Sequence, residues 1–185
     1  MALTKTPVCD FGKKAEDFKL KSINNKVVTL KDIKGKKATL IMFICNHCPY
    51  VKAIIKDLAK DCNELTNDGI NSVAIMSNDI RNYPEDSFEN MIKFADNNNF
   101  GKISYLFDET QEIAKKYGAV CTPDFFGYDK NLELQYRGRY RELKDLKPIN
   151  NGDSDLKIAM KMIAQTQKGP DEQIPSMGCN IKWFN

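Results

Sequence analysis

The sequence predicts a mixed α/β domain, and three observations lead to this fold class. Short apolar segments rich in β-branched residues alternate with segments whose apolar residues recur at helical spacing. Their order is hairpin, strand, helix, strand, helix, then a hairpin and a last helix, which favours a mixed central sheet flanked by helices. The chain has 185 residues, so we expect one domain over residues 1–185.

The first half combines a hairpin with a strand–helix–strand unit. Residues 18–30 are predicted to form the hairpin, with Asn24-Asn25 as its turn. The apolar segment 38–44 is predicted to be a strand that leads into a helix. That helix has an apolar face made of Val51, Ile54, Ile55, Leu58, Ala59, Cys62 and Leu65. Residues 70–76 are predicted to form the next strand.

The second half begins with a helix inserted between two strands. Pro84 is expected to open this helix, since proline fits the first helical turn. The remaining predicted elements are a strand over 103–107, a short helix over 111–117 closed by Gly118, a hairpin over 125–136 and a last helix capped by Asp153 or Ser154. We expect residues 167–185 to form a tail that packs on the domain.

The most informative motif is Cys45-Asn46-His47-Cys48-Pro49, at the junction between the strand over 38–44 and the helix after it. Two thiols in a Cys-x-x-Cys spacing can close and reopen a disulfide. A helix N-terminus favours a thiolate over a thiol, because its backbone N–H groups and its dipole stabilise negative charge. A protonated His47 would add to this effect. The motif therefore indicates a redox site.

Composition excludes several classes of function. The net charge of +3 is too small to indicate nucleic-acid or anionic-membrane binding. No segment approaches the roughly 18 apolar residues that cross a bilayer, and residues 1–7 lack the apolar core of a secretion signal, so a cytoplasmic protein is expected. No Gly-rich phosphate loop follows a strand, and no nucleotide or flavin cofactor is expected.

The element order together with the Cys pair resembles the thioredoxin-like fold, with an N-terminal hairpin and an inserted helix as additions. The resemblance covers nearly the whole chain. It is carried by segments 43–51, 77–79, 121–126 and 175–183, which are similar to small peroxiredoxin-like proteins of the AhpC/TSA type. It implies that the Thr122-Pro123 bond is cis, and that Thr122, Pro123 and Cys121 form one wall of the site. Thr122 would then offer its backbone groups to an extended substrate.

The resemblance implies a thiol–disulfide oxidoreductase that exchanges the Cys45/Cys48 dithiol with disulfides of a protein or a small molecule. In the thioredoxin order Cys45 attacks and Cys48 resolves the mixed disulfide, while a protein or low-molecular-weight thiol supplies the electrons. Cys48-Pro49 instead matches the peroxidatic position of peroxiredoxins, which implies a peroxidase with antioxidant activity. Cys45 then stands where their threonine lies and Cys121 about where their arginine lies, so both peroxide-activating groups are missing.

Other interpretations stay open at this point. A non-catalytic module that senses redox state and switches partner binding is a third possible function. A structural zinc site is not expected, since four clustered ligands are needed and the other cysteines, Cys9, Cys62, Cys121 and Cys179, are scattered. Cys121 has either a redox role or a packing role. Cys179, in the C-terminal segment, is a possible resolving thiol, because exchange depends on geometric access.

Overall fold

The computed structural model describes residues 3–7 and 9–184. Its centre is a seven-stranded mixed sheet with the strand order β3-β2-β6-β5-β4-β8-β9. The strands are β2 (Lys19–Ser22), β3 (Val27–Thr29), β4 (Ala38–Phe43), β5 (Ile70–Met76), β6 (Ser104–Phe107), β8 (Asp124–Asp129) and β9 (Leu134–Tyr136). β4, β5 and β6 are parallel, whereas β2 and β8 run antiparallel to their neighbours.

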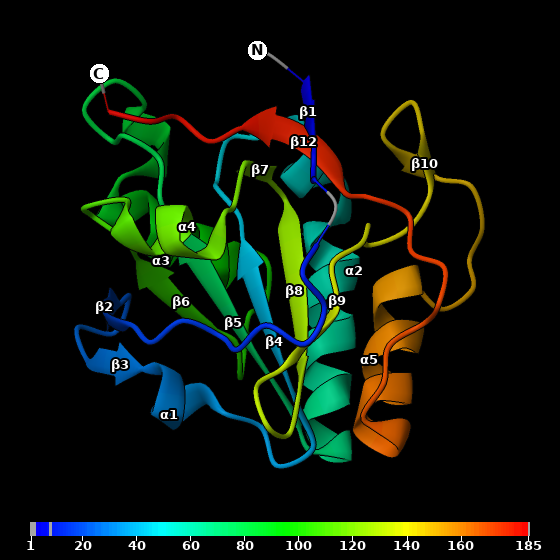
Figure 1. The fold of residues 1–185 in the computed structure, drawn as a ribbon. Coiled ribbons are helices and arrows are strands. Elements are labelled where there is room, and N and C mark those ends of the chain that lie inside the picture. Colours follow the sequence, from blue (N-terminus) through cyan, green and yellow to red (C-terminus); the bar gives the residue numbers. More distant parts are fainter. Residues whose placement is uncertain (1–2, 8, 185) are drawn as a thin grey trace.

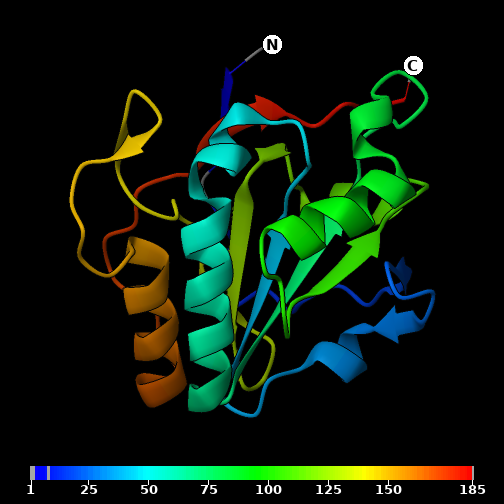
Figure 2. The same ribbon diagram turned by 180° about the vertical axis from the view of Figure 1, so that it is seen from behind.

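Helices cover both faces of this sheet (Figures 1 and 2). The helices are α1 (Leu30–Ile33), α2 (Pro49–Leu65), α3 (Phe88–Asn97), α4 (Glu112–Tyr117) and α5 (Asp155–Thr166). Figure 2 shows α2, α3 and α5 on one face, and Figure 1 shows α4 on the other. β4 is buried along its whole length because successive side chains alternate between the two cores: Leu40 and Met42 face α2, and Ile41 and Phe43 face the opposite side. The expected mixed sheet flanked by helices is confirmed.

The inserted segment differs in detail from the sequence prediction. Pro84 opens a short 3-10 turn, η2 (Pro84–Asp86), rather than the helix itself. α3 starts two residues after this turn, where the Ser87 side chain accepts a hydrogen bond from the Asn90 backbone N–H and caps the helix. The difference matters because η2 places Asp86 beside the Cys-x-x-Cys motif.

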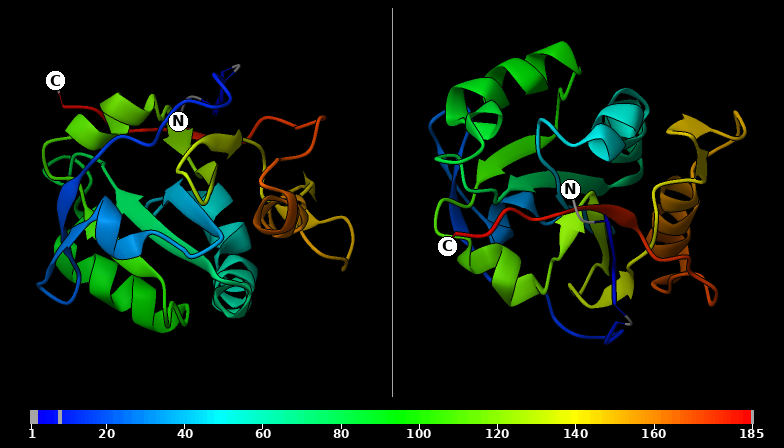
Figure 3. Two further views of the ribbon diagram at one scale, coloured as in Figure 1. Left: turned by 60° about the horizontal axis from the view of Figure 1, so that its bottom comes forward. Right: turned by 90° about the horizontal axis from the view of Figure 1, so that it is seen from above.

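A second, smaller sheet lies across the end of the domain where α2 begins. It has the order β1-β12-β7, made of β1 (Leu3–Lys5), β12 (Met177–Asn180) and β7 (Cys121–Thr122). The view from above in Figure 3 shows the C-terminal segment running over this end. A separate hairpin, β10 (Leu143–Lys144) and β11 (Lys147–Pro148), projects beside α5. Segments from near the two ends of the chain, β1 and β12, therefore pair at the end of the domain that carries the Cys-x-x-Cys motif.

Within the described part of the chain, none of the helices has the length and apolar character needed to cross a membrane.

Candidate active site

The Cys-x-x-Cys motif forms the turn between β4 and α2. Cys48 is the N-cap residue of α2, and Pro49 occupies the first helical turn, where its missing N–H costs no hydrogen bond. Cys45 comes two residues after β4 ends. Both cysteines are buried, with 1% and 0% of their surfaces exposed. The site is therefore closed to bulk solvent in this conformation.

The loop that ends in Pro123 lies against the Cys-x-x-Cys motif through Thr122. The Thr122–Pro123 peptide bond is cis. The Thr122 hydroxyl oxygen lies 3.3 Å from the Cys45 sulfur, and the Cys48 thiol donates to the Thr122 carbonyl oxygen at 3.1 Å. Thr122 therefore contacts both sulfurs of the motif.

A third sulfur completes the cluster. Cys179, on β12, has its Sγ 3.1 Å from the Cys48 Sγ. The sequence named Cys179 only as a possible resolving thiol, since 131 residues separate it from Cys48. β12 brings it here by pairing with β7, so that Cys179 lies opposite Thr122.

The remaining cysteines are outside this contact network. Cys121 is buried, and its thiol lies 3.5 Å from the Pro123 carbonyl oxygen, its acceptor, rather than against the motif. Burial raises the pKa of Cys121 well above its usual value, and Cys48 and Cys179 are near enough to add to this shift. Burial likewise raises the pKa of Cys62, beneath α2, to about 12. Neither thiol is ionised at neutral pH, so neither is a nucleophile there.

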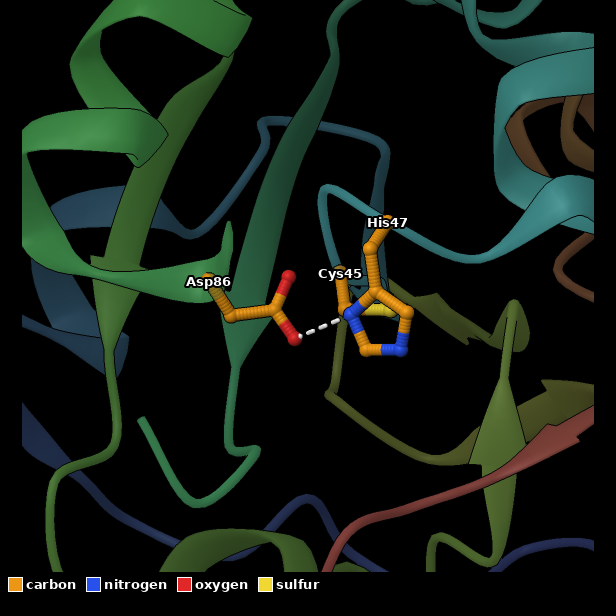
Figure 4. Close-up of side chains that lie close together, drawn as sticks. All are labelled: Cys45, His47 and Asp86. Carbon is orange, nitrogen blue, oxygen red and sulfur yellow. Dashed lines mark hydrogen bonds and ion pairs between the residues drawn. The ribbon is translucent and has the colours of Figure 1, made fainter. Parts of the chain in front are cut away.

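His47 is fixed by a carboxylate that the sequence did not single out. Its Nδ1 lies 2.7 Å from Oδ2 of Asp86, a fully buried residue of η2 (Figure 4). Asp86 also accepts from the Asn46 backbone N–H and the Asn78 side-chain amide, at 2.7 and 2.8 Å. The His47 ring stacks on Tyr83 with 5.5 Å between ring centroids. Asp86 and Tyr83 together therefore hold the imidazole in one orientation beside Cys45.

Asp86 escaped the sequence analysis because Glu85-Asp86 after Pro84 has the appearance of the acidic first turn of a helix. Acidic residues are common there for dipole reasons alone. Asp86 is 39 residues away from His47 in the sequence. The local sequence pattern does not indicate that the fold brings the two side chains together.

Three side chains of this site, those of Cys45, His47 and Asp86, are also a candidate metal centre. The ligating atoms of Cys45, His47 and Asp86 lie within 4.8 Å of one another, and no other group among residues 3–7 and 9–184 has such an arrangement. Both carboxylate oxygens of Asp86 already accept N–H groups. A metal would have to displace the His47 hydrogen bond, so these donors fit a hydrogen-bonded pair better than a metal centre.

The environment of the two motif thiols separates their pKa values. Hydrogen bonding to Cys45 lowers the pKa of Cys48 to about 5, helped by the Cys179 thiol and the Val51 amide against the effect of burial. The same hydrogen bond and burial raise the pKa of Cys45. The Thr122 carbonyl accepts only from a protonated Cys48 and so opposes ionisation. The balance favours a thiolate at Cys48, whereas the thioredoxin order would place it at Cys45.

The expected pH behaviour of His47 can be measured directly, because it is the only histidine in the chain. The hydrogen bond to Asp86 raises its pKa. We predict that Asp86→Asn lowers this pKa toward the unperturbed value of about 6.5, as followed by proton NMR of the imidazole. A raised folded-state pKa stabilises the protein below pH 6.5 or so, and this contribution disappears as the pH rises through the folded pKa. The stability difference between wild type and Asp86→Asn should therefore shrink with rising pH; identical His47 titrations would contradict the pairing.

Fold and site together define a thioredoxin-like protein with a buried Cys-x-x-Cys pair at the start of α2. The model of the AhpC/TSA family matches residues 11–137, and the chain belongs to this family. A structure titled as an uncharacterised conserved protein from Geobacillus kaustophilus is 40% identical, with a TM-score of 0.94 over 100% of this chain and 97% of that chain. A hypothetical protein from Sinorhizobium meliloti 1021 is 36% identical, with a TM-score of 0.90 over 98% of both chains.

More distant structures share the fold alone. The thioredoxin domain of a thiol-disulfide oxidoreductase from Bacteroides vulgatus is 16% identical, with a TM-score of 0.59 over 70% of this chain and 89% of that chain. A comparison with curated proteins finds no match. The fold is therefore thioredoxin-like, and the family is AhpC/TSA.

Proposed function

We propose that this protein is a thiol–disulfide oxidoreductase that exchanges its Cys45/Cys48 dithiol with disulfides of proteins or small molecules. The observation that carries the proposal is the pair of adjacent thiols with opposite pKa shifts, held against the loop that ends in the cis bond. A thiolate next to a protonated thiol is the arrangement needed for attack followed by resolution.

The pKa directions favour Cys48 as the attacking sulfur. Its thiolate attacks one sulfur of the substrate disulfide and forms a mixed disulfide, and the second substrate sulfur leaves as a thiolate that takes up a proton. Cys45 then loses its proton and attacks Cys48, which releases the first substrate thiol and leaves a Cys45–Cys48 disulfide. Two electrons pass to the substrate, and a protein or low-molecular-weight thiol returns them. Such a cycle suits the reducing cytoplasm.

A cavity beside the loop that ends in Pro123 is the place where we propose that the substrate binds. The cavity has a volume of about 510 Å³ and is bounded by Tyr50 in the first turn of α2, by Pro123 and by Ser176 and Met177 of the C-terminal segment. Its lining mixes apolar side chains with charged ones, among them Arg139 and Glu142. A lining of this kind and a volume of this size support a peptide segment as substrate.

A thiol peroxidase is the second candidate, and the lowered pKa of Cys48 favours it. Cys48 would then be oxidised to a sulfenic acid that condenses with another thiol. Arg137 does not supply the missing peroxide-activating group. Its guanidinium binds Asp124 at 3.0 Å and the Gly118 carbonyl at 2.7 Å, and it stacks on Phe126 in the other core.

One assay separates the candidates. The reduced protein is supplied with a thiol reductant and, in parallel reactions, with a peptide disulfide or hydrogen peroxide. The proposal predicts catalytic reduction of the disulfide and only slow loss of peroxide. Fast peroxide loss with the disulfide spared would establish the peroxidase, and no turnover of either would favour the redox-sensing module.

A further inference from the structure

The C-terminal strand covers the backbone to which, under the proposed function, an extended substrate would pair. β12 pairs antiparallel with β7, with Cys179 opposite Thr122 and Asn180 opposite Cys121. The Ile181 backbone N–H extends the pairing by donating to the Val120 carbonyl at 3.1 Å. The backbone beside Pro123, to which a substrate strand would add by β-augmentation, is therefore already paired within the chain.

The strand is seated closely against this backbone. A Cβ built on Gly178 would lie 2.1 Å from the Thr122 carbonyl oxygen, so only glycine permits the approach. On the same side, the Ser176 hydroxyl donates to the Pro123 carbonyl at 2.7 Å. These two contacts fix the register of β12 against the loop that ends in Pro123. Cys179 comes directly after Gly178, and its sulfur lies 3.1 Å from that of Cys48.

We propose that β12 is a tethered, substrate-like strand and that Cys179 is a third redox-active thiol, which forms a disulfide with Cys48. This inference rests on the proposed thiol–disulfide exchange. A mixed disulfide between Cys48 and an external thiol is attacked by Cys179, which loses its proton to the departing external thiolate. The product is a Cys48–Cys179 disulfide. Cys179 attacks a Cys45–Cys48 disulfide in the same way, with Cys45 leaving, so no further oxidant is needed.

The distances make Cys48 the common partner of two competing thiols. A disulfide bond is about 2.05 Å long, so the Cys48 and Cys179 sulfurs at 3.1 Å need only a small approach. Closing this bond fastens β12 to the start of α2 and keeps the Thr122 backbone covered. Opening it, by attack of Cys45 on Cys48, removes this covalent tie and leaves β12 held over Thr122 by noncovalent contacts, as in this structure. An external strand can then compete with β12 for the Thr122 backbone.

The test uses Cys45→Ser, in which Cys179 is the remaining thiol in contact with Cys48. The folded, reduced variant is treated with oxidised glutathione, blocked with an alkylating agent and digested, and its disulfides are mapped by mass spectrometry. We expect a Cys48–Cys179 link as the main product. Cys45→Ser/Cys179→Ser should instead keep glutathione on Cys48. Cys45→Ser/Cys121→Ser is the matched control and should retain the link, since the Cys121 thiol points to Pro123.

The inference is overturned if Cys45→Ser keeps glutathione on Cys48 while Cys179 is alkylated. Cys45→Ala repeats the test if the serine variant does not fold. Cys179→Ser distinguishes this failure from failure of the proposed function, because it should still close Cys45–Cys48 under the same treatment. If that link is also missing, both the proposed function and the inference are wrong.

Discussion

Cys48→Ser is expected to lower the rate of disulfide reduction on the order of 10³-fold or more, as is usual when a covalent nucleophile is removed. Cys48 is the sulfur with the lowered pKa, and both Cys45 and Cys179 interact with it. A serine hydroxyl is not ionised at neutral pH and forms no disulfide. The rate is measured with the peptide disulfide under excess thiol reductant, with circular dichroism as the check on folding.

Cys62→Ala is the matched control for this loss. Cys62 lies on the same helix and is as deeply buried, at 1% exposed, but its raised pKa keeps it neutral. Its replacement should cost about 1 kcal/mol of stability through lost packing and leave the turnover rate within a factor of about two. If Cys48→Ser still reduced disulfides at the rate of the control, the attacking nucleophile would be another thiol.

Gly178→Ala is expected to have the largest effect on the position of β12. The added Cβ meets a backbone carbonyl at 2.1 Å, so β12 and β7 must separate. Such overpacking costs roughly 1–3 kcal/mol. It also moves Cys179 away from Cys48, so the yield of the Cys48–Cys179 link in a Cys45→Ser background should fall several-fold. Chemical denaturation and disulfide mapping give the two readouts.

Gly152→Ala is the control for the glycine itself. Its added Cβ would find only the Asn150 side-chain oxygen, at 3.7 Å, in an exposed turn. We expect its stability to stay within about 0.5 kcal/mol of wild type and the link to form at the wild-type yield. Equal behaviour of the two alanine variants would show that β12 is not held by its close approach to Thr122.

Local patterns carried most of the fold prediction. β5 has the predicted bounds of residues 70–76, and the hairpin over 18–30 forms with Asn25 in the left-handed conformation at its turn. α5 is capped by Ser154, one of the two residues proposed. These elements follow from periodicity and turn chemistry, which act over a few residues. The cis bond before Pro123 followed from the resemblance to thioredoxin-like proteins.

The parts of the site that the sequence did not resolve depend on contacts between distant segments. Asp86 reaches His47 only because η2 replaces the first turn of the expected helix. β1, β7 and β12 have two to four residues each and pair only with one another, so none shows a strand period of its own. The sequence consequently leaves open which residues lie near Cys179, whereas the fold places its sulfur against that of Cys48. The order of pKa values between Cys45 and Cys48 likewise needs their neighbours in space.

The most direct test of the central claim is a thiolate titration, because ultraviolet absorbance detects a thiolate without requiring access to it. The reduced wild-type protein, Cys48→Ser and Cys45→Ser are titrated under the same conditions. We expect wild type to show one thiolate step with a midpoint well below the free-cysteine value of about 8.5, and Cys48→Ser to lack this step. In Cys45→Ser the step should remain, since the serine hydroxyl can still donate a hydrogen bond to the Cys48 thiolate. A wild-type protein with no step below about 8.5 would contradict a thiolate at Cys48, and so would an early step that survives in Cys48→Ser and is lost in Cys45→Ser.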